Sequence, residues 1–428
     1  MRAPVGSPAV SPAAPPNVLV VCVDCLRADH VHGGYADTPF LDSLQAAGLA
    51  ATDMYAAATT TSPCVAGLLT GTHAERHGVL SLAVGPLAGD VRTFAERFAA
   101  AGYHTEALVT GPLVAETGLD RGFDRYRYRE PDESLFTGWR AAARDRLGSL
   151  PAPFAAFVHL WEVHEDVHVP ATYDDPAYGA TPYARALSAL DRELEALLSA
   201  VPEDTLLAVT GDHGESITNR HSPVRLGLKS LRDALKYYGG VDTRPYARRC
   251  NRRLADRGAA VPDHYLENGH GENAFDYAAH VPFVLAGPGV EPATVDATTR
   301  QVDVLPTLLA AAEVETDADL AAVDGASFRP PADVEARPAY IRACGESLRQ
   351  RDNWARAVRH DGEKYVEYPD RDWPASLYDL ETDPAELDPV VDPDPERVAH
   401  LRRQFPDAAL GDGERLAVDE RLRLLGYR

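Results

Sequence analysis

The stretch Asn17-Val-Leu-Val-Val-Cys-Val-Asp24 decides how this chain folds, together with Leu206-Leu-Ala-Val-Thr-Gly-Asp212-His213-Gly-Glu215 far downstream. Each is a short apolar run, rich in β-branched residues, that ends in polar residues at a turn, which predicts two buried strands. In open α/β sheets, binding sites form at the carboxyl ends of the strands. Two carboxylates and one imidazole delivered to that edge suit a divalent cation. We therefore expect Asp24, Asp212 and His213 to bind a metal ion.

Strand-like and helical patterns alternate along much of the chain. Apolar runs at 154–160 and 282–286 join the two above, and helical spacing covers 91–101 and 184–200. This alternation predicts an α/β fold in which a large mixed, mostly parallel sheet is sandwiched by helices. A small C-terminal α+β subdomain should follow, with strands near 339–342, 354–359 and 364–367 and a helix near 395–405.

These patterns divide the chain into parts. Residues 1–16 are rich in Pro and Ala and lack the apolar core of a signal peptide, so we expect a disordered leader. Residues 17–329 form the predicted main domain, and residues 339–428 form the subdomain after a Pro-rich linker. No run approaches the roughly eighteen apolar residues of a membrane span. Without an export signal, we expect a cytoplasmic protein.

Hydroxyl side chains cluster in Thr59-Thr60-Thr61-Ser62-Pro63, directly before an apolar run that ends at Gly71. This order predicts a helix that begins near Thr61. Ser and Thr at such an end satisfy unpaired amides, and the same end attracts anions. A Thr held there beside a cation can act as a nucleophile. From this segment alone, Thr61 is either a helix cap or a nucleophile.

Taken together, these segments resemble the sulfatase branch of the alkaline phosphatase superfamily. Val23-Asp24-Cys25-Leu26-Arg27 is similar to the family's first metal motif, and the segment from Thr61 to Gly71 is similar to its nucleophile motif. Further matches follow in family order at Phe157-Val-His-Leu-Trp-Glu-Val-His164, Gly211-Asp-His-Gly-Glu215, His270-Gly271 and Val302-Asp-Val-Leu-Pro-Thr-Leu-Leu309. The resemblance covers nearly the whole chain after residue 16. It implies the family fold and a metal-dependent ester hydrolase with a covalent intermediate.

Departures from the family pattern change the expected substrate. A sulfatase needs Cys or Ser at the nucleophile position, because that residue is oxidised to formylglycine, and this chain has Thr61. The second Asp of the metal motif is Cys25, and only three Lys residues occur anywhere in the chain. Thr nucleophiles do occur in phosphate-handling members of the superfamily. We therefore expect a hydrolase of phosphoric mono- or diesters; the alternatives are a sulfatase, a phospho-group transferase and an inactive binding protein.

The resemblance implies three sets of site residues: a metal set of Asp24, Thr61, Asp212 and His213, a catalytic set of Thr61, His164 and His270, and a substrate-binding set of Arg27 and His77. Arg27 could instead pair with Asp29 and order the turn after Asp24. Oxygen ligands favour Ca²⁺, Mg²⁺ or Mn²⁺, whereas a second, His-rich site would favour Zn²⁺. Glu162 and His168 are not expected to form such a site, and His159 is expected to be a plain strand residue.

The composition restricts the partners of the chain. Asp and Glu number 65 against 42 Lys and Arg, which gives a formal net charge of −23. Such a surface indicates a halophile, or a surface that repels anionic polymers, and on either interpretation nucleic acid is not an expected partner. The expected partner is a small anionic ester. The five Cys residues are scattered and odd in number, which favours buried thiols over disulfides.

One segment, residues 217–269, is an Arg-rich insertion in this acidic chain. It is too long for an unstructured loop, and Leu226, Leu228, Leu231 and Leu235 have helical spacing. One interpretation is a helical cover whose arginines pair with the acidic body. The other is a lid that recognises an anionic substrate, because Arg binds phosphate and carboxylate through paired donors.

Overall fold

The computed structural model describes residues 14–217, 222–255, 263–267, 269–314, 322–329, 334–346, 351–406 and 415–418. The leader predicted for residues 1–16 lies outside the described residues up to residue 13. Parts of the predicted linker and the last ten residues of the chain also lie outside them.

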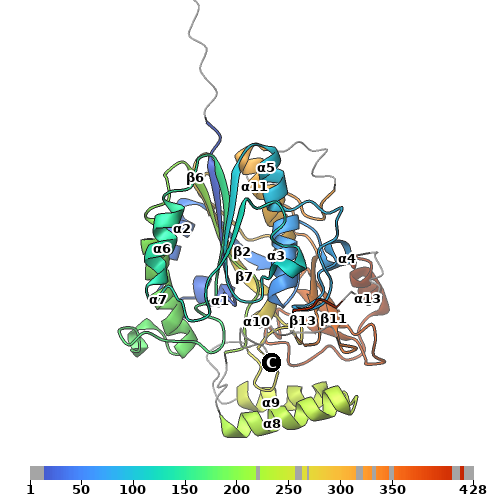
Figure 1. Cartoon of the computed structure of the whole chain (residues 1–428). Helices are drawn as coiled ribbons and strands as arrows, with labels where there is room; N and C mark the ends of the chain where they lie inside the picture. Colours follow the sequence, from blue (N-terminus) through green and yellow to red (C-terminus); the bar gives the residue numbers. More distant parts are fainter. Residues whose placement is uncertain are drawn as a thin grey trace, which may run out of the picture.

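Within the described residues, a nine-stranded sheet has the order β4-β3-β5-β1-β6-β7-β2-β8, and β9 pairs with β2 (Figure 1). The strands are β1 (Asn17–Val23), β2 (Leu49–Tyr55), β3 (His104–Val109), β4 (Arg125–Tyr128), β5 (Phe154–Leu160), β6 (Thr205–Gly211), β7 (His280–Ala286), β8 (Ala293–Val295) and β9 (Thr299–Arg300). The block β4-β3-β5-β1-β6 is parallel throughout, while β7 runs antiparallel to both of its neighbours. The predicted mixed, mostly parallel sheet is confirmed.

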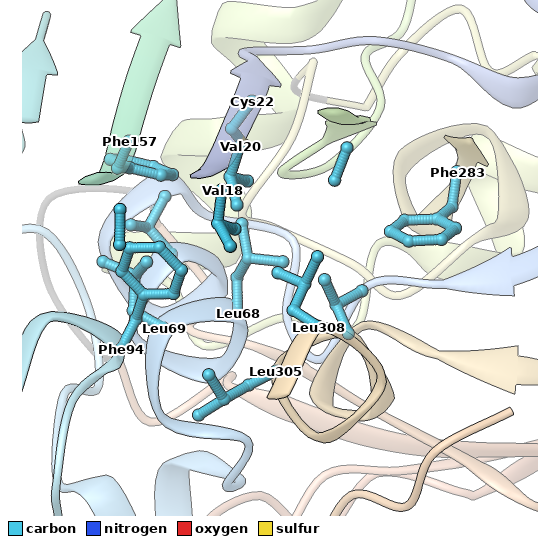
Figure 2. Packing of buried hydrophobic residues seen from close by; sticks show 14 of the residues in the cluster. Val18, Val20, Cys22, Leu68, Leu69, Phe94, Phe157, Phe283, Leu305 and Leu308 are labelled. Carbon is cyan, nitrogen blue, oxygen red and sulfur yellow. The ribbon is translucent and has the colours of Figure 1, made fainter. Parts of the chain in front are cut away.

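Helices cover both faces of the sheet because β1 is apolar on both sides. Val18, Val20 and Cys22 belong to one core cluster, together with Leu68 and other residues of α3 (Thr61–Thr70), α5 (Phe94–Ala100) and α11 (Val304–Ala312) (Figure 2). The alternate β1 residues belong to the opposite cluster, with α2 (Pro39–Ala47), α6 (Trp139–Leu147) and α7 (Pro182–Leu198). Fully buried strands of this kind are typical of a sheet covered on both sides.

The register of the central strands determines where the polar motifs lie. Val23 pairs with Leu160 on one side and with Gly211 on the other. The residues that follow these positions, Asp24 and Asp212, therefore leave the sheet side by side at its carboxyl edge. The Asp24 amide extends the ladder by donating to the Leu160 carbonyl at 2.7 Å. Short elements complete the domain: α1 (Ala28–His32), α4 (Ala74–His77), α10 (Asp276–Ala279), η1 (Ala115–Thr117), η2 (Pro176–Tyr178) and η4 (Gln301–Asp303).

A second sheet, near the C-terminus, has the antiparallel order β10-β11-β12-β13. Its elements are β10 (Ala339–Ala343), β11 (Ala355–His360), β12 (Glu363–Glu367), β13 (Ser376–Asp379) and the helix α13 (Pro395–Arg402). Three of these strands and the helix correspond to predicted elements, whereas β13 was not predicted. Arg342 of β10 exchanges backbone hydrogen bonds with the segment before α3, at 3.0 Å to the Thr59 amide and 3.1 Å to the Ala57 carbonyl. The small α+β subdomain thus braces the chain that leads to Thr61.

The insertion forms a helical hairpin at one end of the molecule (Figure 1). It consists of α8 (Pro223–Asp233), the wide turn η3 (Ala234–Tyr238) and α9 (Arg244–Ala255). We use "hairpin" for these residues, 223–255. The predicted helix is present in α8, but its leucines face outward and its basic residues Arg225 and Arg232 are buried.

Among the described residues, no helix combines the length and the apolar character that crossing a membrane requires.

Candidate active site

Four predicted residues come together at the carboxyl edge of the sheet. Thr61 Oγ1 lies 3.2 Å from His213 Nε2 and 3.5 Å from Asp24 Oδ2. His213 Nε2 lies 3.7 Å from Asp24 Oδ1 and 3.4 Å from Asp212 Oδ2. All four side chains are buried. Their polar atoms therefore face one small common space.

The chemistry of these atoms fits a cation. Burial lowers the pKa of His213, and its Nδ1 lies 2.9 Å from the Gly214 carbonyl oxygen, which requires Nδ1 to carry the hydrogen. The lone pair of Nε2 is then directed at the two carboxylates. Asp24 Oδ1 and Asp212 Oδ2 accept no hydrogen bond from any described residue. Electron-rich atoms buried together in this way are costly unless a positive charge lies among them. The residues fit a bound divalent metal ion.

Thr61 is placed by the helix that it begins. It is the first residue of α3, and Thr60 occupies the capping position without a side-chain cap. Thr60 Oγ1 instead lies 3.1 Å from Cys344 Sγ. The interpretation of Thr61 as a helix cap is therefore wrong, because its hydroxyl is directed at Asp24 and His213.

The glycines of Gly211-Asp-His-Gly214 permit close packing around the two ligands. A Cβ at Gly214 would lie 2.1 Å from the Tyr277 carbonyl oxygen, and one at Gly211 would lie 2.7 Å from that of Leu26. Larger residues would force these backbones apart. The motif thus allows Asp212 and His213 to be held between two other segments.

His159, expected to be a plain strand residue, also reaches the site. Its Nδ1 lies 2.8 Å from Thr110 Oγ1, and its Nε2 lies 3.7 Å from Asp212 Oδ2. It is buried in β5, one residue before the strand ends. A signal existed in the sequence, because a polar residue near the carboxyl end of a buried apolar strand points to the same edge as Asp24.

A second group of possible ligand atoms adjoins the first. Cys25, His164, Glu215 and His270 each place one such atom within 4.8 Å of the others. Cys25 Sγ lies 3.5 Å from Glu215 Oε2, and His270 Nδ1 lies 3.2 Å from the same oxygen. The His270 ring lies 4.5 Å from that of His213, between centroids. Sequence reasoning placed His164 and His270 in the site but did not include Cys25 or Glu215.

Cys25 is held in an unusual backbone conformation. Its φ of 63° is in the left-handed region, which is strained for a residue with a side chain. Its amide donates to Asp212 Oδ1 at 3.0 Å, and its carbonyl accepts from the Tyr183 hydroxyl at 2.7 Å. Burial, with the nearby carboxylates, raises the pKa of the thiol well above its usual value. Without a metal ion, Cys25 is a poor nucleophile.

The two residues assigned to substrate binding make other contacts. The Arg27 guanidinium binds Asp29 through two hydrogen bonds, of 3.0 and 2.7 Å, and donates to the Glu215 carbonyl at 2.8 Å. This is the pairing that the sequence left open as the alternative, and it ties the turn after Asp24 to the Asp212 segment. His77 is fully buried in α4, where burial lowers its pKa to about 3. Contact of either residue with a substrate stays a prediction.

None of the three lysines is needed to build the site. Lys229 and Lys236 lie in the hairpin, paired with Asp233 and Glu272 respectively. Lys364 is buried in β12 against Asp276 and Glu386. A bound anion would therefore depend on a metal ion, on histidines and on backbone amides.

An open pocket of about 390 Å³ begins beside His164. Its lining includes Trp161 and Phe136 together with acidic side chains such as Asp132 and Asp166. This acidic wall would repel a polyanion. It leaves room for a neutral or cationic group.

Comparisons with known proteins identify the family and the fold. The profile of the sulfatase family matches residues 16–314. An uncharacterized sulfatase of Escherichia coli K12, YidJ, is 24% identical over 348 residues, which are 70% of this chain and 68% of that protein. Among solved structures, the phosphonate monoester hydrolase of Agrobacterium radiobacter superposes with a TM-score of 0.67 at 18% identity, covering 96% of this chain and 95% of that one. BT1596, described as a 2-O GAG sulfatase, superposes with a TM-score of 0.63 at 18% identity, covering 91% and 90%.

The structural likenesses support the fold, and the profile extends from residue 16 through α11, which includes every residue of the metal set. The chain belongs to the sulfatase family.

Proposed function

We propose that this protein is a metal-dependent hydrolase of phosphoric esters that uses Thr61 as its nucleophile. The carrying observation is the position of the Thr61 hydroxyl, 3.2 Å from His213 Nε2 and 3.5 Å from Asp24 Oδ2, where buried carboxylate oxygens lack hydrogen-bond partners among the described residues. Asp24, Asp212, His213 and Thr61 would hold a divalent ion. When bound, such an ion lowers the pKa of the hydroxyl and neutralises charge on the ester oxygens.

The chain's own residues would carry out two displacements. Thr61 Oγ1 loses its proton towards Asp24 and bonds to phosphorus, while the bond from phosphorus to the leaving alcohol breaks. His270 or His164 gives the departing oxygen a proton. Water then gives one proton to that histidine and attacks phosphorus, the bond to Thr61 breaks, and the phosphate product leaves as Thr61 regains its proton from Asp24. An alcohol in place of water would make the reaction a phospho-group transfer.

Three features support phosphoric esters over sulfuric esters as the substrates. Thr61 has a methyl on Cβ, so it cannot give the formylglycine aldehyde whose hydrate releases sulfate. Its ester has to be hydrolysed at the central atom, a route open to phosphothreonine beside a cation. The lysines are all engaged elsewhere.

Named relatives include a phosphonate monoester hydrolase and sulfatases, so they favour neither ester class. An inactive binding protein is disfavoured, since idle buried carboxylates are costly.

The reaction class can be tested with matched aryl esters. We expect kcat/KM for an aryl phosphate mono- or diester to exceed that for the same aryl sulfate at least about tenfold, or about 1.4 kcal/mol in transition-state free energy. Mass spectrometry should confirm that Thr61 is unmodified in the same preparation. A neutral or cationic leaving group should be preferred because the pocket beside His164 is acidic. Faster hydrolysis of the sulfate would overturn the proposal.

One observation favours a second metal ion in the proposed enzyme. The group of Cys25, His164, Glu215 and His270 combines sulfur and nitrogen donors, which select zinc, whereas the first set is mainly oxygen. If zinc binds there, the two histidines act as ligands, and proton donation passes to water.

Metal analysis of the purified protein distinguishes these arrangements. We expect the Cys25→Ser variant to lose bound zinc while it keeps the ion of the Asp24 site. Cys25 Sγ also lies near Asp24 and His213, but the whole metal set of Asp24, Thr61, Asp212 and His213 is unchanged in this variant. Cys64→Ser is a matched control, since Cys64 is also buried but its thiol contacts the Ala58 carbonyl. Equal zinc content in both variants and in the wild type would show that the second group binds no zinc.

A further inference from the structure

The hairpin exposes apolar side chains and buries basic ones. Among the described residues, eight of the ten exposed large hydrophobic side chains belong to it. Its basic residues Arg225, Arg232 and Lys236 are buried instead. A surface helix normally does the reverse, burying its apolar stripe and exposing its charges. The exposed stripe therefore needs an explanation beyond the fold of one chain.

The buried basic residues have clear partners. Arg232 Nη2 lies 2.7 Å from Glu272 Oε2, and Lys236 Nζ lies 2.5 Å from Glu272 Oε1. Arg225 donates to the Tyr265 carbonyl at 2.5 Å and to the Glu267 carbonyl at 3.2 Å. These contacts fix which side of α8 faces the body. They leave the apolar side no freedom to turn inward.

Five of the eight exposed apolar residues form one narrow line. Val224, Leu228 and Leu231 lie on one side of α8 at spacings of four and three residues, and Leu235 and Tyr238 continue the same spacing in η3. Their exposed fractions range from 43% for Leu228 to 89% for Tyr238. We call these five residues the apolar seam. A seam with alternating spacings of four and three is the pattern by which one helix packs against another.

Charge decides between the surfaces that could cover the seam. An anionic lipid surface would need free cations beside the seam, but Arg225 and Arg232 of α8 are buried and Lys229 is paired with Asp233. On α9, by contrast, Arg249 and Arg253 are exposed. The acidic body of another copy of this chain is their complement.

We infer that α8 is a dimerisation helix whose apolar seam packs against the seam of a second copy of this chain. A twofold axis across α8 would bring the same residues of both copies together, since such an interface is self-complementary. Gly227 and Ala234, seven residues apart beside the seam, would let the two helices approach closely. Arg232 of α8 and Lys236 of η3 form ion pairs with Glu272, which lies two residues after His270. The dimer would therefore also hold the segment that carries His270 in place.

The mass of the full-length protein in solution tests this inference. By light scattering after size exclusion, we expect a dimer for the wild type and a monomer for the double variant Leu228→Asp/Leu231→Asp. Both leucines are exposed in the single chain, so its circular dichroism should be unchanged. Val391→Asp is the matched control, because Val391 is 92% exposed outside the hairpin. It should remain dimeric.

Salt and lipid complete the test. An apolar seam should hold the dimer in about 1 M KCl, where the Debye length falls to about 3 Å. The inference is overturned if the wild type is a monomer, if the double variant stays a dimer, or if the wild type is a monomer that the seam anchors to phosphatidylglycerol vesicles. None of these measurements depends on enzymatic activity, so they stand apart from the proposed reaction.

Discussion

Replacing Thr61 by Ala should abolish turnover while the fold survives. Removal of a covalent nucleophile typically lowers kcat by on the order of 10⁶-fold, because no neighbouring group can form the same intermediate. The stability effect should be small. The substitution removes one hydroxyl whose contacts, at 3.2 and 3.5 Å, are long for hydrogen bonds, so we expect at most about 0.5–1.5 kcal/mol in the free energy of unfolding. Steady-state kinetics and thermal unfolding measure the two effects.

Two further variants make this result specific. Thr60→Ala is the same chemical change one residue earlier, but the Thr60 hydroxyl faces Cys344, so activity should be nearly unchanged. Thr61→Ser keeps the hydroxyl and should keep most of the activity. Acid-quenched wild-type protein should carry one phosphoryl group on the peptide that contains Thr61. Near wild-type activity in Thr61→Ala would instead point to Ser62 or Cys25 as the nucleophile.

The sequence predicted the parts of the site that strands deliver. Asp24 and Asp212 end adjacent parallel strands, and a run of buried β-branched residues reveals both the strand and its polar end. Thr61 was found through its family motif, and its hydroxyl cluster alone could not separate a cap from a nucleophile. The structure separates them, since Thr60 holds the capping position.

Other features could not be predicted from a single sequence. The group of Cys25, Glu215 and His270 joins three separate segments, and hydrophobic periodicity carries no information about such loop contacts. The antiparallel direction of β7 was likewise hidden, because a buried strand has the same apolar pattern in either direction. The leucine spacing predicted that α8 is a helix, but it did not predict which side of the helix faces the protein. The buried partner Glu272, distant in sequence, decides which side faces inward.

Several sequence predictions still await measurement. The boundaries 17–329 and 339–428, the cytoplasmic location and the halophilic source rest on composition and patterning alone. The role of the insertion is clearer in one respect. Arg225 donates to two carbonyls within the insertion itself, and Arg232 pairs with Glu272 just after it, so both are poorly placed to recognise a substrate in this conformation.

Replacing Asp24 by Asn should change the stability of the protein in opposite directions with and without a bound metal ion. Asp24 and Asp212 direct ligand atoms within 4.8 Å of one another, and neither Asp24 Oδ1 nor Asp212 Oδ2 accepts a hydrogen bond from a described residue. In metal-free protein, Asp24→Asn should therefore raise the free energy of unfolding, by about 1–3 kcal/mol, because it removes a like-charge interaction in a buried site. In metal-loaded protein the same change should be destabilising. It removes a charged ligand, and an ion at 100 times its Kd contributes about 2.7 kcal/mol of stability that the variant loses.

This reversal of sign separates a metal site from a merely strained core. Thermal unfolding with EDTA and with saturating Ca²⁺, Mg²⁺ or Mn²⁺ would measure it, and calorimetric titration would give the metal affinity directly. Asp191→Asn is the matched control, because Asp191 is a buried carboxylate that accepts the amides of Phe40 and Leu41 far from the site. Its removal should destabilise the protein equally with and without metal, since it breaks backbone hydrogen bonds that no ion replaces. If Asp24→Asn behaves like Asp191→Asn, the buried carboxylates hold no ion, and the proposed chemistry at Thr61 loses its electrophilic support.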